Sequence, residues 1–481
     1  MCGIIGLIGQ FKHKQEELEQ ACERLKRRGP DSRGVWLSSD QKVGLAHVRL
    51  AIQDLSEHGH QPMLSADQRY VIVFNGEIYN HFALREALGA QAPQWRGHSD
   101  TETLLACIVA WGVEQTLRQA VGMFAFALWD QYERNLVLAR DRFGEKPLYY
   151  TQQDQGLMFA SELKALIPIE EFDKRINRGA VTLLMRHNYI PAPHTIFEQV
   201  YKLPPASYVQ LGEEHLFGQN ELPEPKTYWS AYDVAKRGSE RVFSDDNKAI
   251  DAFEQVLTEA VKGQMLADVS LGAFLSGGTD SSLIVSMMQK QSSHAVKTFA
   301  IGFEQAEYNE APYAKAVAQH LGTEHTELYM DGNDALTVFQ SLADVYSEPF
   351  ADSSQLPVLV MMGLTAQHVK VALSGDAGDE LFGGYKRYAR AQAWWDRYHK
   401  VPAALRPAMA KAVNSLANCL PIGQKQEKLT QLAQVLQARN TVEFYQPFVS
   451  YWKQPEKLVL QSERLRTCFD GKPLRNLQDT M

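Results

Sequence analysis

The sequence predicts a mixed α and β protein whose two halves are built differently. The first half has many short apolar or alternating segments and few helical ones, a pattern typical of sheets packed face to face with helices outside. The second half alternates short apolar strands with helices, which indicates a parallel α/β sheet. Beyond Tyr388 the amphipathic spacing predicts packing helices.

Length and composition set the broad class. The 481 residues suffice for two or three domains, and 45% hydrophobic with 22% charged residues is typical of a globular protein. A net charge of −8 argues against a nucleic-acid or membrane-surface binder. No apolar run reaches the ~20 residues of a membrane helix, and we expect no signal peptide. The cysteines lack metal-ligand spacing, which favours a reduced, cytoplasmic setting: Cys2, Cys22, Cys107, Cys419 and Cys468.

Cys2 follows the initiator methionine directly and precedes the apolar run Ile4–Ile8, the expected first strand. Removal of Met1 would give one residue both a thiol and a free α-amine. Because such an amine has a pKa of roughly 7.7–8.0, it can take the thiol proton. The alternative is a small buried apolar residue at the edge of a strand, which is a common place for free cysteine.

Periodicity and turn residues place the other elements of the first half. One helix is expected at 15–26, before the turn Arg28-Gly29-Pro30-Asp31, and a second at 81–88. A third begins at the capping sequence 98–102 and continues through 104–111. Strands are expected at 34–37, 43–48, 70–74, 123–129, 136–139, 148–151 and 156–160.

Six segments of this half, in order, resemble the glutaminase domain of class II glutamine amidotransferases. They are 2–4 (CGI), 28–31 (RGPD), 46–50 (AHVRL), 74–80 (FNGEIYN), 99–102 (SDTE) and 139–149 (ARDRFG with KPLY). The resemblance implies an N-terminal-nucleophile hydrolase, an αββα sandwich over residues 2–205, that hydrolyses glutamine at Cys2.

The resemblance also implies roles that suit amide hydrolysis. Attack on an amide builds a negative oxygen, for which the Asn75 side chain and the Gly76 N–H form an oxyanion hole. Arg49 suits the α-carboxylate of glutamine, and the carboxylates of Glu77 and Asp100 suit its α-ammonium. Taken alone, Asn75-Gly76 indicates a hairpin turn, and Arg49 and Asp100 indicate surface charges. The ordered set favours the functional interpretation.

The middle of the chain is rich in proline and scattered charge. Strands are expected at 207–211 and 227–230, within a linker that we place at 206–245. A helix at 247–266, apolar at four-residue spacing, opens the second domain, which we place at 246–481.

A strand-like run at 269–275 leads into the glycine-rich segment 276–282 (SGGTDSS) and an apolar helix at 283–288. A strand, a glycine-rich turn and a helix aim backbone N–H groups and a positive helix end at an anion. The segment lacks the Gly-Lys-Ser/Thr of a Walker A loop. Asp280 suits such a site if Mg²⁺ bridges it to phosphates. The alternative is a glycine turn with Asp280 as a helix cap.

Later segments complete the expected parallel sheet, whose ligand would lie outside the carboxyl ends of its strands. Strands are expected at 298–301 and 370–373, and helices at 311–321, 335–343 and 356–366. The tail is expected to be helical at 403–420, 428–438 and 442–452.

The segment 276–282 resembles the pyrophosphate loop of ATP pyrophosphatases. Further segments resemble the asparagine synthetase type: 298–303 (TFAIGF), 307–310 (EYNE), 347–349 (SEP), 352–354 (DSS) and 372–385 (ALSGDAGDELFGGY). The resemblance implies ATP-binding positions at Leu275, Ser276, Gly277, Gly278, Asp280, Ser281, Ser282, Ile301, Ser374 and Gly375.

The same resemblance assigns the remaining groups of the second site. Asp280 and Asp352 are the candidate Mg²⁺ ligands. Glu348 is a candidate general base, and Asp376 lies on the loop that would face the acyl-adenylate. For Glu348 the alternative is a turn before a helix, which Glu348-Pro349 suits equally well.

One family segment is not found. Between Tyr388 and Met481 there is no lysine-bearing Asp-Asp-x-Leu-x-Lys-x-Asp-Arg pattern, whose lysine contacts ATP phosphates in the family. We therefore expect a form with the C-terminal part missing, or a variant without the second half-reaction. Without that cation the developing pyrophosphate loses stabilisation, so glutamine hydrolysis would outlast amide synthesis.

The whole pattern predicts a glutamine-dependent asparagine synthetase that activates aspartate as aspartyl-AMP, using ATP and Mg²⁺. One alternative is a related amidotransferase acting on a sugar acid or a peptide. Another is a truncated homologue that binds but does not synthesise. The resemblance implies a homodimer; no nucleic-acid or membrane partner is expected.

Overall fold

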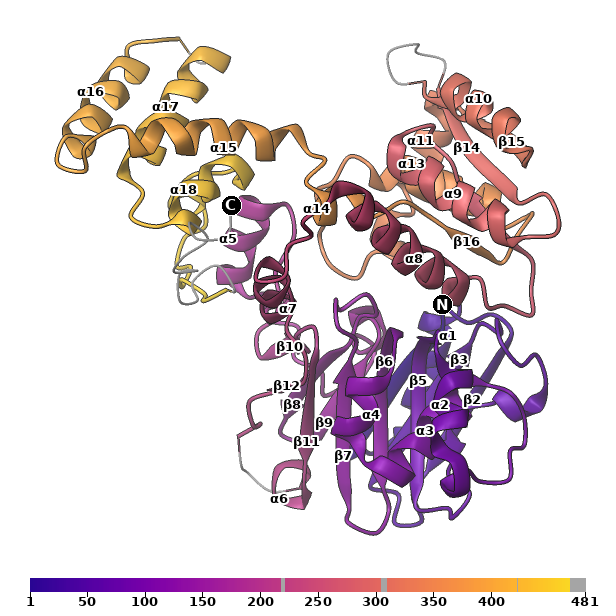
Figure 1. The fold of residues 1–481 in the computed structure, drawn as a ribbon. Coiled ribbons are helices and arrows are strands. Elements are labelled where there is room, and N and C mark those ends of the chain that lie inside the picture. Colours follow the sequence, from indigo (N-terminus) through magenta and orange to yellow (C-terminus); the bar gives the residue numbers. More distant parts are fainter. Residues whose placement is uncertain (218–220, 304–308, 422, 468–481) are drawn as a thin grey trace. The chain divides into compact units, whose positions relative to one another are not determined.

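The computed structural model describes residues 1–217, 221–303, 309–421 and 423–467 (Figure 1). Glu307 and Tyr308 of the predicted motif, and Cys468, lie outside the described residues. The chain forms two compact units. The first contains residues 1–176, 192–348 and 353–374, and the second contains 177–191, 349–352 and 375–481.

Two antiparallel six-stranded sheets form the first part of unit 1. One has the order β10-β8-β9-β1-β3-β2 and the other β12-β11-β7-β6-β5-β4. The strands of the first are β1 (Gly3–Gly9), β2 (Ser32–Leu37), β3 (Val43–Arg49), β8 (Tyr149–Gln153), β9 (Gly156–Ala160) and β10 (Val200–Lys202). Those of the second are β4 (Met63–Leu64), β5 (Tyr70–Ile78), β6 (Gly122–Asp130), β7 (Asn135–Arg140), β11 (Ser207–Leu211) and β12 (Lys226–Thr227).

The two sheets share a buried apolar layer with helices outside. Ile4 and Phe159 of the first sheet and Trp129 of the second belong to one fully buried cluster. Three helices cover the outer face of the second sheet (Figure 1): α2 (His81–Leu88), α3 (Asp100–Trp111) and α4 (Val113–Gln119). The helix α1 (Lys14–Leu25) packs on β1 and β3. This is the αββα sandwich that the sequence predicts.

A third, parallel sheet has the order β15-β14-β13-β16. Its strands are β13 (Leu271–Phe274), β14 (Lys297–Phe303), β15 (Glu324–Met330) and β16 (Val371–Leu373). The accompanying helices are α8 (Asp246–Gln264), α9 (Thr279–Gln291), α10 (Ala311–Leu321), α11 (Gly332–Phe339), α12 (Leu342–Val345) and α13 (Gln355–Thr365). The predicted parallel α/β architecture of the second half is confirmed.

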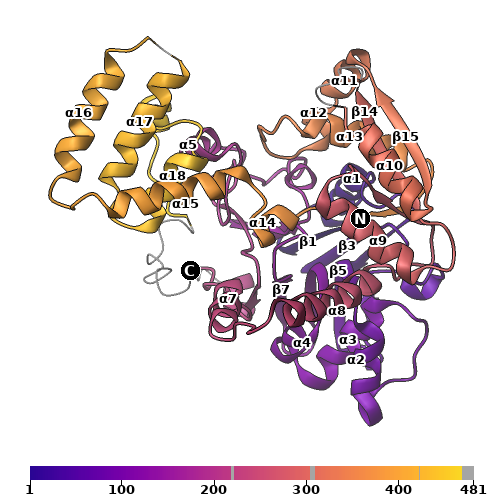
Figure 2. The same cartoon turned by 45° about the horizontal axis from the view of Figure 1, so that its top comes forward.

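Unit 2 is helical. Its described helices are α5 (Arg178–His187), α14 (Gly378–Phe382), α15 (Lys386–His399), α16 (Arg406–Asn418), α17 (Gln424–Gln437) and α18 (Thr441–Val449), which Figure 2 shows from a second direction. Tyr398, Val435 and Phe444 form its small apolar core, with Trp394 and Trp395 packed against it. Among the described residues no helix is both long and apolar enough to cross a membrane.

Four local predictions differ from the structure. β5 continues through Asn75–Ile78 rather than ending at 74, because it pairs with β6 along its full length. The helix expected at 335–343 is two helices, because the Ser341 N–H turns back to the Val338 carbonyl. Residues 206–245 contain the helices α6 (Glu213–Leu216) and α7 (Ala231–Ser239), and Ser230, expected in a strand, caps α7. The sequence analysis contains no prediction for several other elements, among them α4, α5, β4, β10, β15 and α15.

Candidate active sites

Cys2 lies at the start of β1, where its neighbours hold it from two sides. The Arg28 side chain donates to the Cys2 carbonyl over 2.8 Å. The Cys2 sulfur lies 3.4 Å from the Leu50 nitrogen and 3.7 Å from the Leu50 oxygen. With Met1 in place, burial raises the pKa of the thiol and lowers the pKa of the Met1 amine to about 6. The Met1 amine is therefore mostly neutral at pH 7.

Asn75, on β5, has a buried side-chain amide without hydrogen-bond partners among the described residues. Its side chain is fully buried, and neither amide atom has a hydrogen-bond partner among the described residues. Gly76 pairs with Phe124, and an added Cβ would lie 2.3 Å from the Met123 oxygen. Because a buried unsatisfied amide is costly, this arrangement suits a site that a ligand completes.

Two carboxylates lie near Cys2, the half-buried Glu77 and the buried Asp100. The Glu77 carboxylate accepts from Gln53 Nε2 over 2.6 Å, and the Asp100 carboxylate accepts from the Ile78 N–H over 2.8 Å. Burial, and then the charge of Asp100, raises the pKa of Glu77. Burial raises the pKa of Asp100 to about 6. Lys146 and the terminal amine offset only part of the rise in the pKa of Glu77, so this carboxylate pair favours binding of an ammonium group.

Arg49 closes the loop that faces Cys2. Its guanidinium donates to the Ser56 carbonyl over 2.9 Å, to the Gln53 carbonyl over 3.4 Å and to the Asp54 carbonyl. It is 8% exposed, and an added Cβ on Gly59 would collide with it. Most of its donors therefore hold the 53–56 turn, and any ligand carboxylate would share the guanidinium with these carbonyls.

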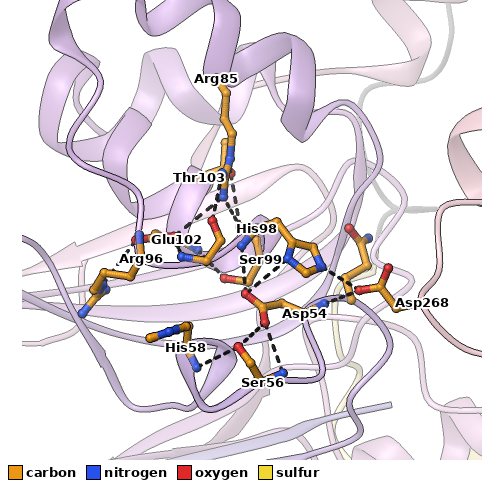
Figure 3. Close-up of polar contacts among 12 residues, drawn as sticks. Asp54, Ser56, His58, Arg85, Arg96, His98, Ser99, Glu102, Thr103 and Asp268 are labelled. Carbon is orange, nitrogen blue, oxygen red and sulfur yellow. Dashed lines mark hydrogen bonds and ion pairs between the residues drawn. The ribbon is translucent and has the colours of Figure 1, made fainter.

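A polar frame surrounds this loop (Figure 3). The Asp54 carboxylate accepts from the Ser56 hydroxyl and N–H and from the His98 N–H, the latter over 2.8 Å. Arg85 donates to the Ser99 carbonyl over 3.1 Å. Ser99 caps α3, the helix that begins at Asp100. The loop and the Asp100 side chain therefore belong to one connected framework.

Some residues that shape this site had no role in the sequence analysis. His47 contacts the Phe74 carbonyl over 3.1 Å, Gln61 accepts the Phe74 N–H over 2.6 Å, and together they fix the strand next to Asn75. Burial lowers the pKa of His47 to about 3, so it is neutral. Lys146 is 5% exposed, burial lowers its pKa, and its Nζ lies 2.8 Å from the Met123 sulfur. His47 and Lys146 stand inside the matched segments, but Gln61 carries no sequence signal.

The glycine-rich segment joins β13 to α9. Ser276 and Ser281 contact each other through their hydroxyls at 2.9 Å, and Gly278 precedes α9 without a side-chain cap. Gly277 has φ +78°, and an added Cβ would lie 2.7 Å from the Ala314 nitrogen. The Ser282 hydroxyl is buried with no partner among the described residues. An uncapped helix start with an orphaned hydroxyl suits an anionic ligand.

The other predicted nucleotide and metal positions are distributed over both units. Leu275 is 1% exposed and donates to the Phe299 carbonyl, and Ile301 lies on the neighbouring β14. Asp280 is in the first turn of α9, and Ser374 follows β16. Gly375, Asp376 and Asp352 belong to unit 2. The described residues contain no group of three acidic, histidine or cysteine side chains that would hold a metal by themselves.

Both carboxylate oxygens of Glu348 have partners, one in an ion pair and the other in a hydrogen bond. Lys202 Nζ lies 2.6 Å from Oε2, and the Ile196 N–H donates to Oε1 over 2.8 Å. The two charged side chains are 14% and 11% exposed, so the pair is largely buried. A proton transfer to this carboxylate would have to displace one of these partners.

Comparison with known families covers both halves of the chain. A model described as a glutamine amidotransferase domain matches residues 1–229, and one described as asparagine synthase matches residues 252–478.

Individual relatives extend over most of the chain. A Methanocaldococcus jannaschii protein, provisionally named asparagine synthetase [glutamine-hydrolyzing] 2, is 34% identical over 87% of this chain and 83% of its own length. Asparagine synthetase [glutamine-hydrolyzing] 1 of Bacillus subtilis is 34% identical over 89% of this chain and 65% of its own. The amidase chry2 of Gibberella zeae is 30% identical over 87% of this chain and 64% of its own. The chain thus spans under two thirds of some curated relatives.

Proposed function

Because this chain belongs to the family of glutamine-hydrolysing asparagine synthetases, we propose that it transfers the amide nitrogen of glutamine to the side chain of aspartate. Glutamine is hydrolysed in the domain that we place at 2–205. ATP activates aspartate as aspartyl-AMP in the domain that we place at 246–481, beyond a linker at 206–245. The products are asparagine, glutamate, AMP and pyrophosphate.

The buried, unpartnered amide of Asn75 carries the first half of this proposal. After removal of Met1, the α-amine of Cys2 takes the thiol proton and the sulfur attacks the glutamine amide carbon. Asn75 and the Gly76 N–H hold the oxyanion, which collapses to a thioester as ammonia leaves. Water then releases glutamate and regenerates the thiol.

The charged groups around Cys2 orient the substrate in this scheme. The α-ammonium of glutamine lies against Glu77 and Asp100, whose raised pKa values fall when the cation arrives. Its α-carboxylate approaches Arg49, which keeps its contacts with the 53–56 turn. Glutamine binding therefore replaces the repulsion between the Glu77 and Asp100 carboxylates with their attraction to the bound ammonium group.

The glycine-rich segment supports the second half. The backbone of Ser276–Gly278 and the hydroxyls of Ser281 and Ser282 bind the pyrophosphate end of ATP, and the orphaned Ser282 hydroxyl gains a partner. Leu275, Ile301 and Ser374-Gly375 contact the rest of the nucleotide. Ammonia attacks the acyl carbon of aspartyl-AMP, Glu348 takes a proton from it, and AMP leaves.

Mg²⁺ fits the donor set of this site only with help from the nucleotide. Asp280 and Asp352 would hold it, and the ion would neutralise charge on the phosphates. Asp376 would face the adenylate from its loop in unit 2. A homodimer is proposed on family grounds alone.

A second acceptor class deserves the same assay, because a fungal relative is named an amidase rather than a synthetase. In this alternative the acceptor is another carboxylate, a sugar acid or a peptide.

One assay separates these proposals. The protein is supplied with glutamine, Mg-ATP and aspartate, or with other carboxylic acids, and glutamate, AMP and pyrophosphate are measured. AMP that depends on aspartate supports asparagine synthesis, and AMP only with another acid supports the alternative. Glutamate release without AMP for any acid overturns synthesis by this chain, and absence of glutamate release overturns the glutaminase assignment.

A further inference from the structure

The loop at 50–56 touches two of the three charged groups proposed to orient glutamine, Arg49 and Glu77. Its Leu50 backbone contacts the Cys2 sulfur, and its Gln53 side chain donates to Glu77. Its 53–56 carbonyls are bound by Arg49. A small displacement of this loop would therefore move both Leu50, which contacts the Cys2 sulfur, and Gln53, which donates to Glu77.

Two side chains of the parallel-sheet region hold this loop from outside. Asp268 Oδ2 accepts from the Asp54 N–H over 2.8 Å and contacts His98 Nε2 at 2.7 Å (Figure 3). Lys370 Nζ lies 2.6 Å from Asp31 Oδ2, and that same oxygen accepts the Ala51 N–H over 2.8 Å. The loop is thus fastened at positions 51 and 54.

Both anchors stand at the beginnings of two paired strands, the inner strand β13 and the edge strand β16. Asp268 precedes β13 and Lys370 precedes β16, and these strands run parallel with Leu271 opposite Val371. The Lys370 N–H donates to the Ser270 carbonyl over 3.1 Å, which joins the two anchor segments. The other ends of the same strands lead into the nucleotide positions Leu275–Ser276 and Ser374.

Stability alone gives little reason for these contacts. Asp268 and His98 are 43% and 52% exposed, and Lys370 and Asp31 are 32% and 33% exposed. Pairs this accessible to solvent contribute little to the stability of the fold. Their geometry instead connects each strand start to the loop beside Cys2, directly through Asp268 and through the Asp31 carboxylate for Lys370.

We propose that Asp268 and Lys370 are positioning residues for glutamine hydrolysis, and that β13 and β16 link the nucleotide segment to the 50–56 loop. The inference rests on the proposed function. Binding of ATP at the carboxyl ends of β13 and β16 restrains the positions of both strands, including their amino-terminal ends. Asp268 and Lys370 lie at those ends, so their contacts then restrain the 50–56 loop. Glutamine then meets a preformed pocket when ATP is bound.

The test measures glutamine hydrolysis by the full chain with and without Mg-ATP. Asp268→Ala and Lys370→Met should each raise the KM for glutamine about tenfold and abolish the effect of ATP on that KM. Asp268→Asn, which keeps an acceptor oxygen, should lie between Asp268→Ala and the wild type. Lys290→Met is the matched control, because Lys290 forms an exposed 2.6 Å pair with Glu254 in the same half.

The outcomes are distinct. Thermal melting of each variant identifies a folding defect, which would lower the active fraction and kcat without changing KM. An unchanged KM in both folded variants, or an ATP effect that persists in them or is absent from the wild type, overturns the inference. A wild type that hydrolyses no glutamine overturns the proposed function itself.

Discussion

Asn75 and Ser282 share a property that is uncommon in folded proteins, a buried polar group with no hydrogen-bond partner among the described residues. Asn75 belongs to β5 of the antiparallel sandwich and Ser282 to α9 beside the parallel sheet. Each lies in one of the two segments that we propose to bind a substrate. Such groups favour a bound ligand over an empty site because the ligand supplies the missing partner.

Asn75→Ala should remove one oxyanion donor. We expect kcat for glutamine hydrolysis to fall about 10²–10³-fold with a much smaller change in KM. The fold should tolerate the change, because the removed amide has no partner to lose. Steady-state kinetics measure this, with the exposed Asn247→Ala as control. A loss below threefold would remove Asn75 from the mechanism.

Ser282→Ala should weaken ATP binding without lowering the stability of the protein. The hydroxyl has no partner within the described residues, so its removal should leave Tm unchanged or slightly higher. ATP affinity, measured by equilibrium dialysis, should fall about tenfold because a phosphate contact is lost. Unchanged affinity would show that the hydroxyl does not meet the nucleotide.

Asp100 should make glutamine binding depend on pH. Burial raises its pKa to about 6 in the empty site, so below that pH it is protonated and pairs poorly with an ammonium group. We expect the KM for glutamine to rise as pH falls from 7 to 5. A KM that stays flat across this range would contradict the assignment.

The raised pKa of Asp100 also predicts that lowering the pH stabilises the fold, although it weakens glutamine binding. Since the folded pKa lies above the usual value of 3.8 for aspartate, the ionised group costs stability above about pH 6, and that cost disappears as pH falls towards 4. Asp100→Asn should therefore stabilise the protein at pH 7, by on the order of 1–3 kcal/mol, and not at pH 4.

Asp130→Asn supplies the matched control for that variant. Burial acts to raise the pKa of Asp130, but its bonds to Arg69 and to the Tyr132 and Glu133 N–H groups together lower it. Its replacement should destabilise the protein at pH 7. Urea unfolding at pH 7 and pH 4 measures both changes, and a destabilised Asp100→Asn at pH 7 would contradict the prediction.

At the scale of elements, the glycine-rich segment depends on its backbone conformation. Gly277 combines a φ of +78° with a close approach to α10, where an added Cβ would lie 2.7 Å from the Ala314 nitrogen. Any other residue would be strained in both respects. The segment therefore requires glycine independently of what it binds.

Gly277→Ala should lower Tm by several degrees and weaken ATP binding more than tenfold, because the strained segment moves away from α10. Gly332→Ala is the control, since nothing lies within 4 Å of an added Cβ there. Scanning calorimetry and equilibrium dialysis measure the two effects. Equal behaviour of the two variants would refute the role of the Gly277 conformation.

Most elements with a clear period were predictable from the sequence, including α2 and α10 at their observed limits. β5 was predicted four residues too short, because Asn75-Gly76 looks like a turn unless its pairing with β6 is known. β15 was missed because its residues Glu324, His325 and Glu327 are polar. Local pattern cannot anticipate a strand that is fixed by its neighbour.

The site residues divide in the same way. Cys2, Asn75, Glu77 and Asp100 could be named because they stand in matched segments, and the structure brings the carboxylates together near Cys2. The contacts of Arg49 with its own loop, and of Glu348 with Lys202, depend on distant residues. These partners are separated by long stretches of sequence, and no spacing rule predicts them.

At the scale of the whole molecule, the Lys202–Glu348 pair connects β10 with a segment 146 positions later, 348 minus 202. Both side chains are largely buried, so removing one partner leaves an uncompensated charge. Lys202→Met should destabilise the protein by about 3–5 kcal/mol, and adding Glu348→Gln should recover much of that loss. Urea unfolding of both variants measures the free energy of unfolding. An unchanged value for Lys202→Met would show that the pair does not form.

The central claim is that nitrogen released from glutamine at Cys2 reaches a carboxylate activated by ATP. Glutamine labelled with ¹⁵N in its amide, supplied with aspartate and Mg-ATP, tests it directly. The account predicts label in the side-chain amide of asparagine, in an amount equal to the AMP formed, and no transfer by Cys2→Ala. Label recovered only as free ammonium, with no AMP formed, would contradict it.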